Sequence, residues 1–110
     1  MNRFTLNIDI ETYSSIDLTQ SGVYPYVEAP DFTVLLFAYA MNDQPVQIVD
    51  LAQDGFIPEW VLRALVSADV VKTAWNANFE RTCLSKHFGI ALPPEQWSCS
   101  QAWAMSLGLP

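Results

Sequence analysis

Apolar and polar residues alternate strictly near the start of the chain. Residues 4–11 read FTLNIDIE, so that four apolar side chains are separated by polar ones. A period of two residues is typical of a β-strand with one buried face. The pattern therefore predicts a strand over residues 4–11, with Asp9 and Glu11 on its polar face.

The next forty residues predict a long loop followed by a hairpin. Residues 12–31 are rich in Ser, Thr, Pro, Gly and Asp, which indicates a loop with at most one short turn of helix; loops of this length are often functional. Residues 32–41 form a continuous apolar run, which suits a central strand covered on both faces. Asn42-Asp43 is a turn signal, and residues 46–49 then form the returning strand.

Three helices and two short strands are predicted in the rest of the chain. Pro58 suits the first position of a helix, and a short strand follows over residues 70–75. The second helix is expected to begin at an Asn78 cap and to run to about Phe88, where Gly89 ends it. Residues 97–99 suggest a weak strand and residues 101–107 a last helix. This order indicates an α/β layer architecture that opens with an antiparallel hairpin.

The composition fits one globular domain over residues 1–110, with 51% hydrophobic and only 15% charged residues. The low charged share suits a piece of a larger protein whose faces meet other parts. A net charge of −7 argues against nucleic-acid binding by this chain alone, because phosphate contacts need Lys and Arg. A metal-dependent nuclease site can still lie in an acidic surface, because the cations supply local positive charge.

The sequence predicts a cytoplasmic protein without a membrane partner. Cys83 and Cys99 form neither a CxxC pair nor a disulfide framework. No signal peptide is recognisable, and the longest apolar stretch, residues 34–41, is too short to span a bilayer.

Asp9 and Glu11 are the first candidates for chemistry. Residues two apart on a strand point to the same face, with Cα atoms about 6.6 Å apart. Two carboxylates at that spacing can share a hard cation such as Mg²⁺. The alternative is that D-x-E, a common pattern, is simply the polar face of an edge strand.

Glu80 is the third candidate carboxylate. Its place in the first turn of a helix is favoured by the helix dipole and needs no function. However, Glu80, Cys83, Leu84 and His87 share one helix face, so that Glu80 borders apolar residues and needs a polar partner. Cys83 is expected to pack as a small hydrophobe, and His87 to lie at or near the surface.

The four tryptophans favour core or interface positions over base stacking, because no basic residues interleave with them. They are Trp60, Trp75, Trp97 and Trp103.

The motifs IDIET and NANFERT resemble the first two motifs of the DEDD exonucleases. More closely, DIETYSSIDL, GVYPYVEAPDF, LLFAYA, NANFERTCL and LGLP resemble the start of phage-type and prophage-type family A DNA polymerases. The resemblance spans residues 6–110. It implies a ribonuclease H-like mixed sheet with flanking helices, C-terminally incomplete here. The implied activity is removal of nucleotides from DNA 3′ ends with two divalent metal ions, Mg²⁺ or Mn²⁺.

The resemblance also implies roles for individual residues. Asp9 matches the carboxylate that bridges both metals, and Glu11 matches the second ligand of the first motif. Glu80 stands where the second motif usually has an aspartate that acts on the second metal through water.

Three further positions match residues that line the substrate site. Asn76 and Phe79 match the asparagine and the aromatic residue of the second motif. Thr12 follows the acidic pair and is expected beside the terminal nucleotide.

The chain departs from the family pattern at three points. Glu80 is one methylene longer than the usual aspartate, and Trp75 stands where a histidine often precedes the second motif. The last motif, a tyrosine or histidine followed four residues later by aspartate, is expected beyond Pro110. Two Y-x-x-x-D strings, beginning at Tyr13 and Tyr39, lie in a loop and at a hairpin end, away from any late helix.

The leading hypothesis is therefore a partial proofreading exonuclease domain that lacks its last catalytic motif. Its partners would be a single-stranded DNA 3′ end and the remainder of the polymerase chain. Metal binding and hydrolysis by this chain alone are expected to be weak or absent. The alternative is a non-catalytic structural or interaction module that retains the fold and self-associates. An unrelated nuclease or phosphatase with D-x-E is disfavoured because the resemblance extends far beyond those two residues.

Overall fold

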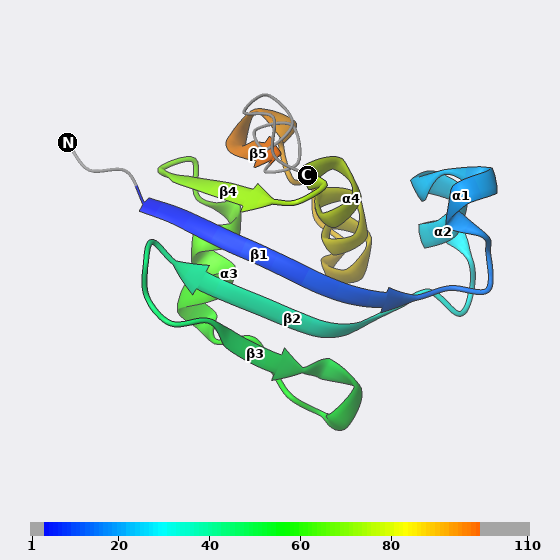
Figure 1. The fold of residues 1–110 in the computed structure, drawn as a ribbon, viewed down its shortest axis with the longest axis horizontal. Helices are drawn as coiled ribbons and strands as arrows, with labels where there is room; N and C mark the ends of the chain where they lie inside the picture. Colours follow the sequence, from blue (N-terminus) through cyan, green and yellow to red (C-terminus); the bar gives the residue numbers. More distant parts are fainter. Residues whose placement is uncertain (1–3, 100–110) are drawn as a thin grey trace, which may run out of the picture.

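A five-stranded mixed sheet organises the molecule, for which a computed structural model describes residues 4–99. The strand order is β3-β2-β1-β4-β5; β1 pairs antiparallel with β2 and parallel with β4 (Figure 1). This confirms the predicted α/β class, and the order is compatible with a ribonuclease H-like fold. The strands are β1 (Phe4–Tyr13), β2 (Thr33–Met41), β3 (Gln47–Asp50), β4 (Val70–Ala74) and β5 (Trp97–Cys99).

Two longer helices pack on the sheet, and two short ones lie beyond the end of β1 (Figure 1). No helix within residues 4–99 is long and apolar enough to cross a membrane. The α-helices are α1 (Leu18–Ser21), α2 (Val23–Glu28), α3 (Glu59–Val66) and α4 (Ala77–Phe88); short 3-10 turns cover Leu51–Gln53 and Pro94–Gln96.

The hydrophobic core lies between one face of the sheet and the helices α3 and α4. The apolar residues of β1 point into it, as their alternation predicts, and they meet buried side chains of both helices. Its members include Leu6, Ile8, Ile10, Phe37, Val61, Leu65 and Leu84. The opposite face of β1 carries Asn7, Asp9 and Glu11, which are exposed. Within residues 4–99 this second face is not covered.

The sequence prediction for β2 is right in one respect and wrong in another. β2 is an interior strand, flanked by β1 and β3, but it is not covered on both faces. Phe37 points into the core, but Leu36 and Ala38 are only partly buried on the opposite face. The apolar run therefore reflects a face that the described part of the chain leaves open.

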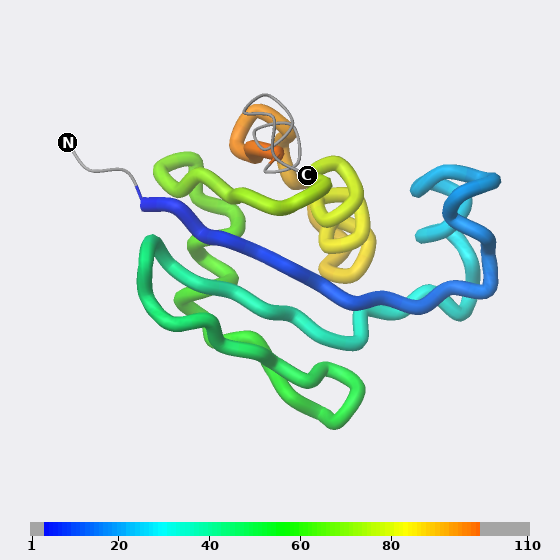
Figure 2. The backbone as a smooth tube through the Cα atoms, in the orientation of Figure 1, coloured from blue at the N-terminus to red at the C-terminus, as the bar shows by residue number. Residues whose placement is uncertain are grey.

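The segment predicted as a loop over residues 12–31 forms two short helices, α1 and α2, between β1 and β2 (Figure 2). Asp17 caps α1 by accepting a hydrogen bond from the Thr19 N–H at 3.0 Å. Helices of four and six residues are too short to produce a recognisable apolar period, which explains why the sequence pattern missed them.

The helix boundaries are close to those predicted, with two corrections. Pro58 precedes α3, which begins at Glu59. Asn76, two residues before the predicted Asn78, caps α4; its side chain accepts a hydrogen bond from the Phe79 N–H at 3.4 Å. Gly89 ends α4 in the left-handed conformation, at φ 68°, as expected.

A buried lysine ties β4 to the segment before β5. The Nζ of Lys72 donates to the carbonyl oxygens of Ser67 and Val70 at 2.8 and 2.9 Å, and to Oε1 of Gln96 at 2.8 Å. All three ammonium protons thus have acceptors, which offsets the cost of burying the charge. Burial also lowers the pKa of Lys72.

Most other side chains behave as their sequence context predicts. Cys83 is buried, and His87 is exposed near the end of α4. Trp97 is partly buried against the core, whereas Trp60 and Trp75 are about half exposed, so that for these two the interface position stays a prediction. Trp103 and the helix predicted over residues 101–107 lie outside the described residues.

Candidate functional site

The strand β1 extends beyond the end of its neighbour β4. The parallel pairing runs from Phe4 opposite Val70 to Asn7 opposite Thr73, and β4 ends at Ala74. Asp9 therefore lies past the last paired residue, at the notch where the chain leaves β4 to begin α4. The other edge of β1 stays hydrogen-bonded to β2, which holds this end of the strand in place.

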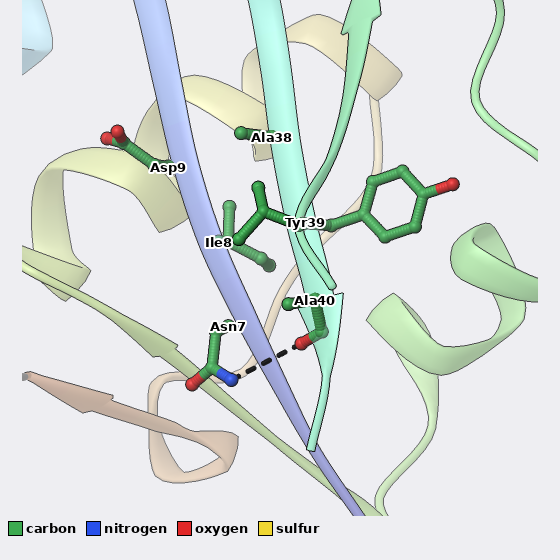
Figure 3. A pocket seen from close by; sticks show the side chains of 7 residues that line it. Asn7, Ile8, Asp9, Ala38, Tyr39 and Ala40 are labelled. Atoms are coloured by element: carbon green, nitrogen blue, oxygen red, sulfur yellow. Dashed lines mark hydrogen bonds between the residues drawn. The ribbon is translucent and has the colours of Figure 1, made fainter. Parts of the chain in front are cut away.

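Asp9 and Glu11 lie on one face of β1, as their spacing predicts. Both side chains are exposed, and their register partners on β2 are Ala38 and Leu36. Figure 3 shows the Asp9 carboxylate pointing away from the ring of Tyr39, which belongs to the core face. The two carboxylates are thus available to a ligand on the uncovered side of the sheet.

Glu80 reaches the same region from α4 but is buried, with only 6% of its surface exposed. Its Oε2 accepts a hydrogen bond from the Asn76 N–H at 3.2 Å. The Asn76 side chain in turn accepts from the Phe79 N–H, so the two residues cap the helix reciprocally. This capping gives Glu80 the polar partner that its apolar surroundings require.

The electrostatics connect Glu80 with Asp9. The pKa of Glu80 is raised to about 7, mainly because burial disfavours the charged carboxylate; the Asn76 hydrogen bond opposes the shift, and the negative charge of Asp9 adds to it. Residues that lie 71 positions apart in the chain are therefore close enough to influence one another. Either a proton or a cation would relieve the repulsion between them.

The donor chemistry suits a hard divalent cation, but the ligand set is not complete. Carboxylate oxygens are the ligands that Mg²⁺ prefers. Within residues 4–99, no three His, Cys, Asp or Glu side chains are close enough together to hold a metal ion. Asp9 and Glu11 of β1 and Glu80 of α4 therefore do not form a metal site on their own.

Two of the three residues predicted to line the substrate site are joined through a tyrosine. The Thr12 hydroxyl lies 2.8 Å from the Tyr26 hydroxyl, and the Tyr26 ring contacts that of Phe79, with centroids 6.0 Å apart. The third, Asn76, caps the same helix. Sequence analysis assigned no role to Tyr26, because its distance along the chain from Asp9 and Glu11 does not predict a contact. Its place within the GVYPYVEAPDF motif is the feature of the sequence that could have drawn attention to it.

A shallow hollow of about 130 Å³ lies next to Asp9 on the uncovered face (Figure 3). The small side chains of Ala38 and Ala40 leave this space open. Asn7 lies at its edge, where Nδ2 donates to the Ala40 carbonyl at 3.3 Å and Oδ1 accepts from the Thr73 hydroxyl at 2.5 Å. The space next to Asp9 is therefore lined mainly by apolar residues, with Asn7 at its margin.

The chain is 61% identical over 106 residues to a protein named DNA polymerase from Bacillus phage SP02. The match covers 96% of this chain but only 16% of that relative. No family model matches the chain, and no solved structure matches it. The predicted resemblance to a phage DNA polymerase is confirmed to this extent, while the assignment to an exonuclease domain stays a prediction.

Proposed function

We propose that this chain forms part of a metal-dependent 3′–5′ exonuclease domain within a family A type DNA polymerase. The observation that carries the proposal is the placement of Asp9 and Glu11 on one face of β1, past its last residue paired with β4, with Glu80 in the first turn of the helix that follows β4. The similarity to a phage DNA polymerase supports the same assignment. Glu11, on the same face as Asp9, is the third carboxylate of the proposed site.

The residues of this chain would contribute a rigid acidic platform. Pairing with β2 fixes the backbone of Asp9 and Glu11, and the Asn76 N–H holds one oxygen of Glu80. Divalent cations bound there would activate water and neutralise charge at a phosphodiester. Thr12 and Phe79, which adjoin the carboxylates in sequence, would line the space for a terminal nucleotide.

The rest of the polymerase would have to complete the site. The described residues supply too few ligands for a metal, and the chain carries a net charge of −7. Further ligands and the basic residues that contact DNA phosphates would therefore come from other parts of the protein. The proposed partners are the remaining polymerase chain and a single-stranded DNA 3′ end.

Calorimetric titration with Mn²⁺ tests the proposal directly. We expect weak binding by the wild-type chain, loss of binding in Asp9→Ala, and retention in Asp69→Ala. Asp69 is a matched control because it is exposed and immediately precedes β4, whose first residue pairs with Phe4 at the opposite end of β1. Equal binding by all three proteins would contradict the assignment, and so would equal loss in both variants.

A second candidate function is a non-catalytic interaction module. Val46, just before the edge strand β3, is 65% exposed, and Ile48, within that strand, is 67% exposed. Exposed apolar residues along a sheet edge favour association with another chain. Sedimentation equilibrium over a range of concentrations tests this alternative; a constant monomer mass would contradict it.

A further inference from the structure

We propose that Tyr26 is a positioning residue, which holds the Glu11–Thr12 end of β1 against the Phe79–Glu80 start of α4. This inference rests on the proposed function and deepens it. The two segments carry carboxylates of the proposed site, yet they belong to different elements. Tyr26, on α2, contacts both of them.

The contacts of Tyr26 combine one polar and several apolar interactions. Its side chain is buried, with 8% of the residue exposed. The hydroxyl group shares a hydrogen bond with the Thr12 hydroxyl, while the ring packs against Phe79 and, edge-on at 5.9 Å, against Phe32. The bond to Thr12 satisfies the buried hydroxyl and at the same time ties α2 to the end of β1.

The end of β1 needs such a contact because the sheet is irregular there. The register between β1 and β2 shifts between Glu11 and Thr12: Glu11 lies opposite Leu36, whereas Thr12 lies opposite Val34. A bulge disrupts the hydrogen-bonded ladder locally and redirects the adjacent side chains. The pairing resumes beyond the bulge, with Thr12 opposite Val34 and Tyr13 opposite Thr33, and the Tyr26 contact adds to it at the first residue after the shift.

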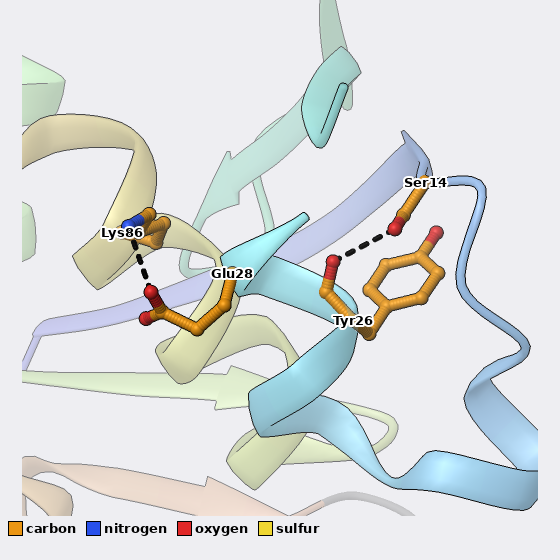
Figure 4. A network of polar contacts seen from close by, with 4 residues as sticks. All are labelled: Ser14, Tyr26, Glu28 and Lys86. Atoms are coloured by element: carbon orange, nitrogen blue, oxygen red, sulfur yellow. Dashed lines mark hydrogen bonds and ion pairs between the residues drawn. The ribbon is translucent and has the colours of Figure 1, made fainter. Parts of the chain in front are cut away.

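The helix α2 is itself anchored to both elements (Figure 4). The Ser14 hydroxyl donates to the Tyr26 carbonyl oxygen at 2.8 Å, which fixes α2 to the chain just after β1. Glu28 pairs with Lys86 of α4 at 3.4 Å, but this pair is exposed and contributes little. The buried Tyr26 side chain thus contacts both segments from a helix that is anchored beside them.

Four variants test the hydrogen bond of the Tyr26 hydroxyl group while the ring at position 26 is kept. Tyr26→Phe and Thr12→Val each remove one partner of the hydrogen bond, and Thr12→Ser keeps it. Tyr24→Phe is the matched control, because Tyr24 lies on the same helix but is 63% exposed. Each protein is titrated with Mn²⁺, and its amide hydrogen exchange is measured residue by residue by NMR without metal.

We expect Tyr26→Phe and Thr12→Val each to weaken Mn²⁺ binding by roughly three- to tenfold, the effect of one lost hydrogen bond. The double variant should bind no more weakly than the worse single variant, because both changes break the same bond. Thr12→Ser and Tyr24→Phe should bind like the wild type. Exchange should accelerate only near residues 11–13 and 76–80. Unchanged binding in both Tyr26→Phe and Thr12→Val would overturn the inference.

The two readouts distinguish failure of this inference from failure of the proposed function. If the wild-type chain binds no Mn²⁺, the proposed metal site is absent from this chain and hydrogen exchange alone decides the role of Tyr26. Local acceleration at the two segments then supports the positioning role. Uniform acceleration across the sheet, or none, refutes it.

Discussion

Glu80 turns back onto the start of its own helix, where its Oε2 accepts a hydrogen bond from the Asn76 N–H at 3.2 Å. The same carboxylate is buried and lies within the electrostatic influence of Asp9. One residue therefore stabilises the first turn of α4 and carries an energetically costly negative charge. Substitutions of Glu80 and Asn76 separate these two consequences.

The raised pKa of Glu80 predicts that the chain loses stability as pH rises from 4.5 to about 7. In this window the unfolded chain has released a proton that the folded chain still holds, so the free energy of unfolding falls with pH. The total change is at most roughly 3 kcal/mol; the contribution is complete below pH 4.5 and lost above 7. Urea denaturation across this range measures the slope.

Glu80→Gln provides the control for the pH effect, because it cannot ionise. Its stability should lack the part of the slope that Glu80 contributes, whereas Glu95→Gln, at an exposed position before β5, should retain it. Identical slopes in the wild type and Glu80→Gln would rule out a raised pKa in the folded chain.

Asn76→Ala should destabilise the chain by about 1 kcal/mol, because it removes the side-chain cap of α4. Asn78→Ala should cost clearly less, since Asn78 makes only an exposed contact with Arg81 at 3.0 Å. Urea denaturation of the two variants at one pH compares them. A larger loss in Asn78→Ala would place the cap where the sequence pattern predicted it.

Lys72→Met should destabilise the chain by roughly 1–3 kcal/mol. The substitution nearly keeps the side-chain volume but leaves three oxygen acceptors, on Ser67, Val70 and Gln96, without their donor. Lys86→Met, which breaks only an exposed ion pair, should change the stability by less than about 0.5 kcal/mol. Thermal denaturation measures both, and similar effects would argue against a structural role for the buried ammonium group.

The chain by itself should release no nucleotides from the 3′ end of labelled single-stranded DNA in the presence of Mn²⁺. The reason is the incomplete ligand set within residues 4–99. Gel analysis of the DNA over time, beside the Asp9→Ala variant, provides the test. Release that depends on both metal and Asp9 would show that this chain suffices for hydrolysis.

The sequence alone determined the features that depend on short-range order. Alternation in FTLNIDIE placed Asp9 and Glu11 on one face of a strand, because neighbouring side chains of a strand point to opposite sides. The apolar pattern after Asn78 likewise predicted that Cys83 and Leu84 are buried, and Gly89 marked the end of α4. These conclusions needed only the periods of the helix and the strand.

Only the tertiary structure decided which distant residues meet. The chain turns from β4 into α4 where β1 continues past its last residue paired with β4, and Tyr26 of α2 contacts both Thr12 of β1 and Phe79 of α4. Strand pairing and helix packing set these relations through contacts between residues far apart in the chain. No local period encodes such contacts. The sequence could therefore predict which face of a strand or helix a residue lies on, but only the fold shows which residues of different elements lie together.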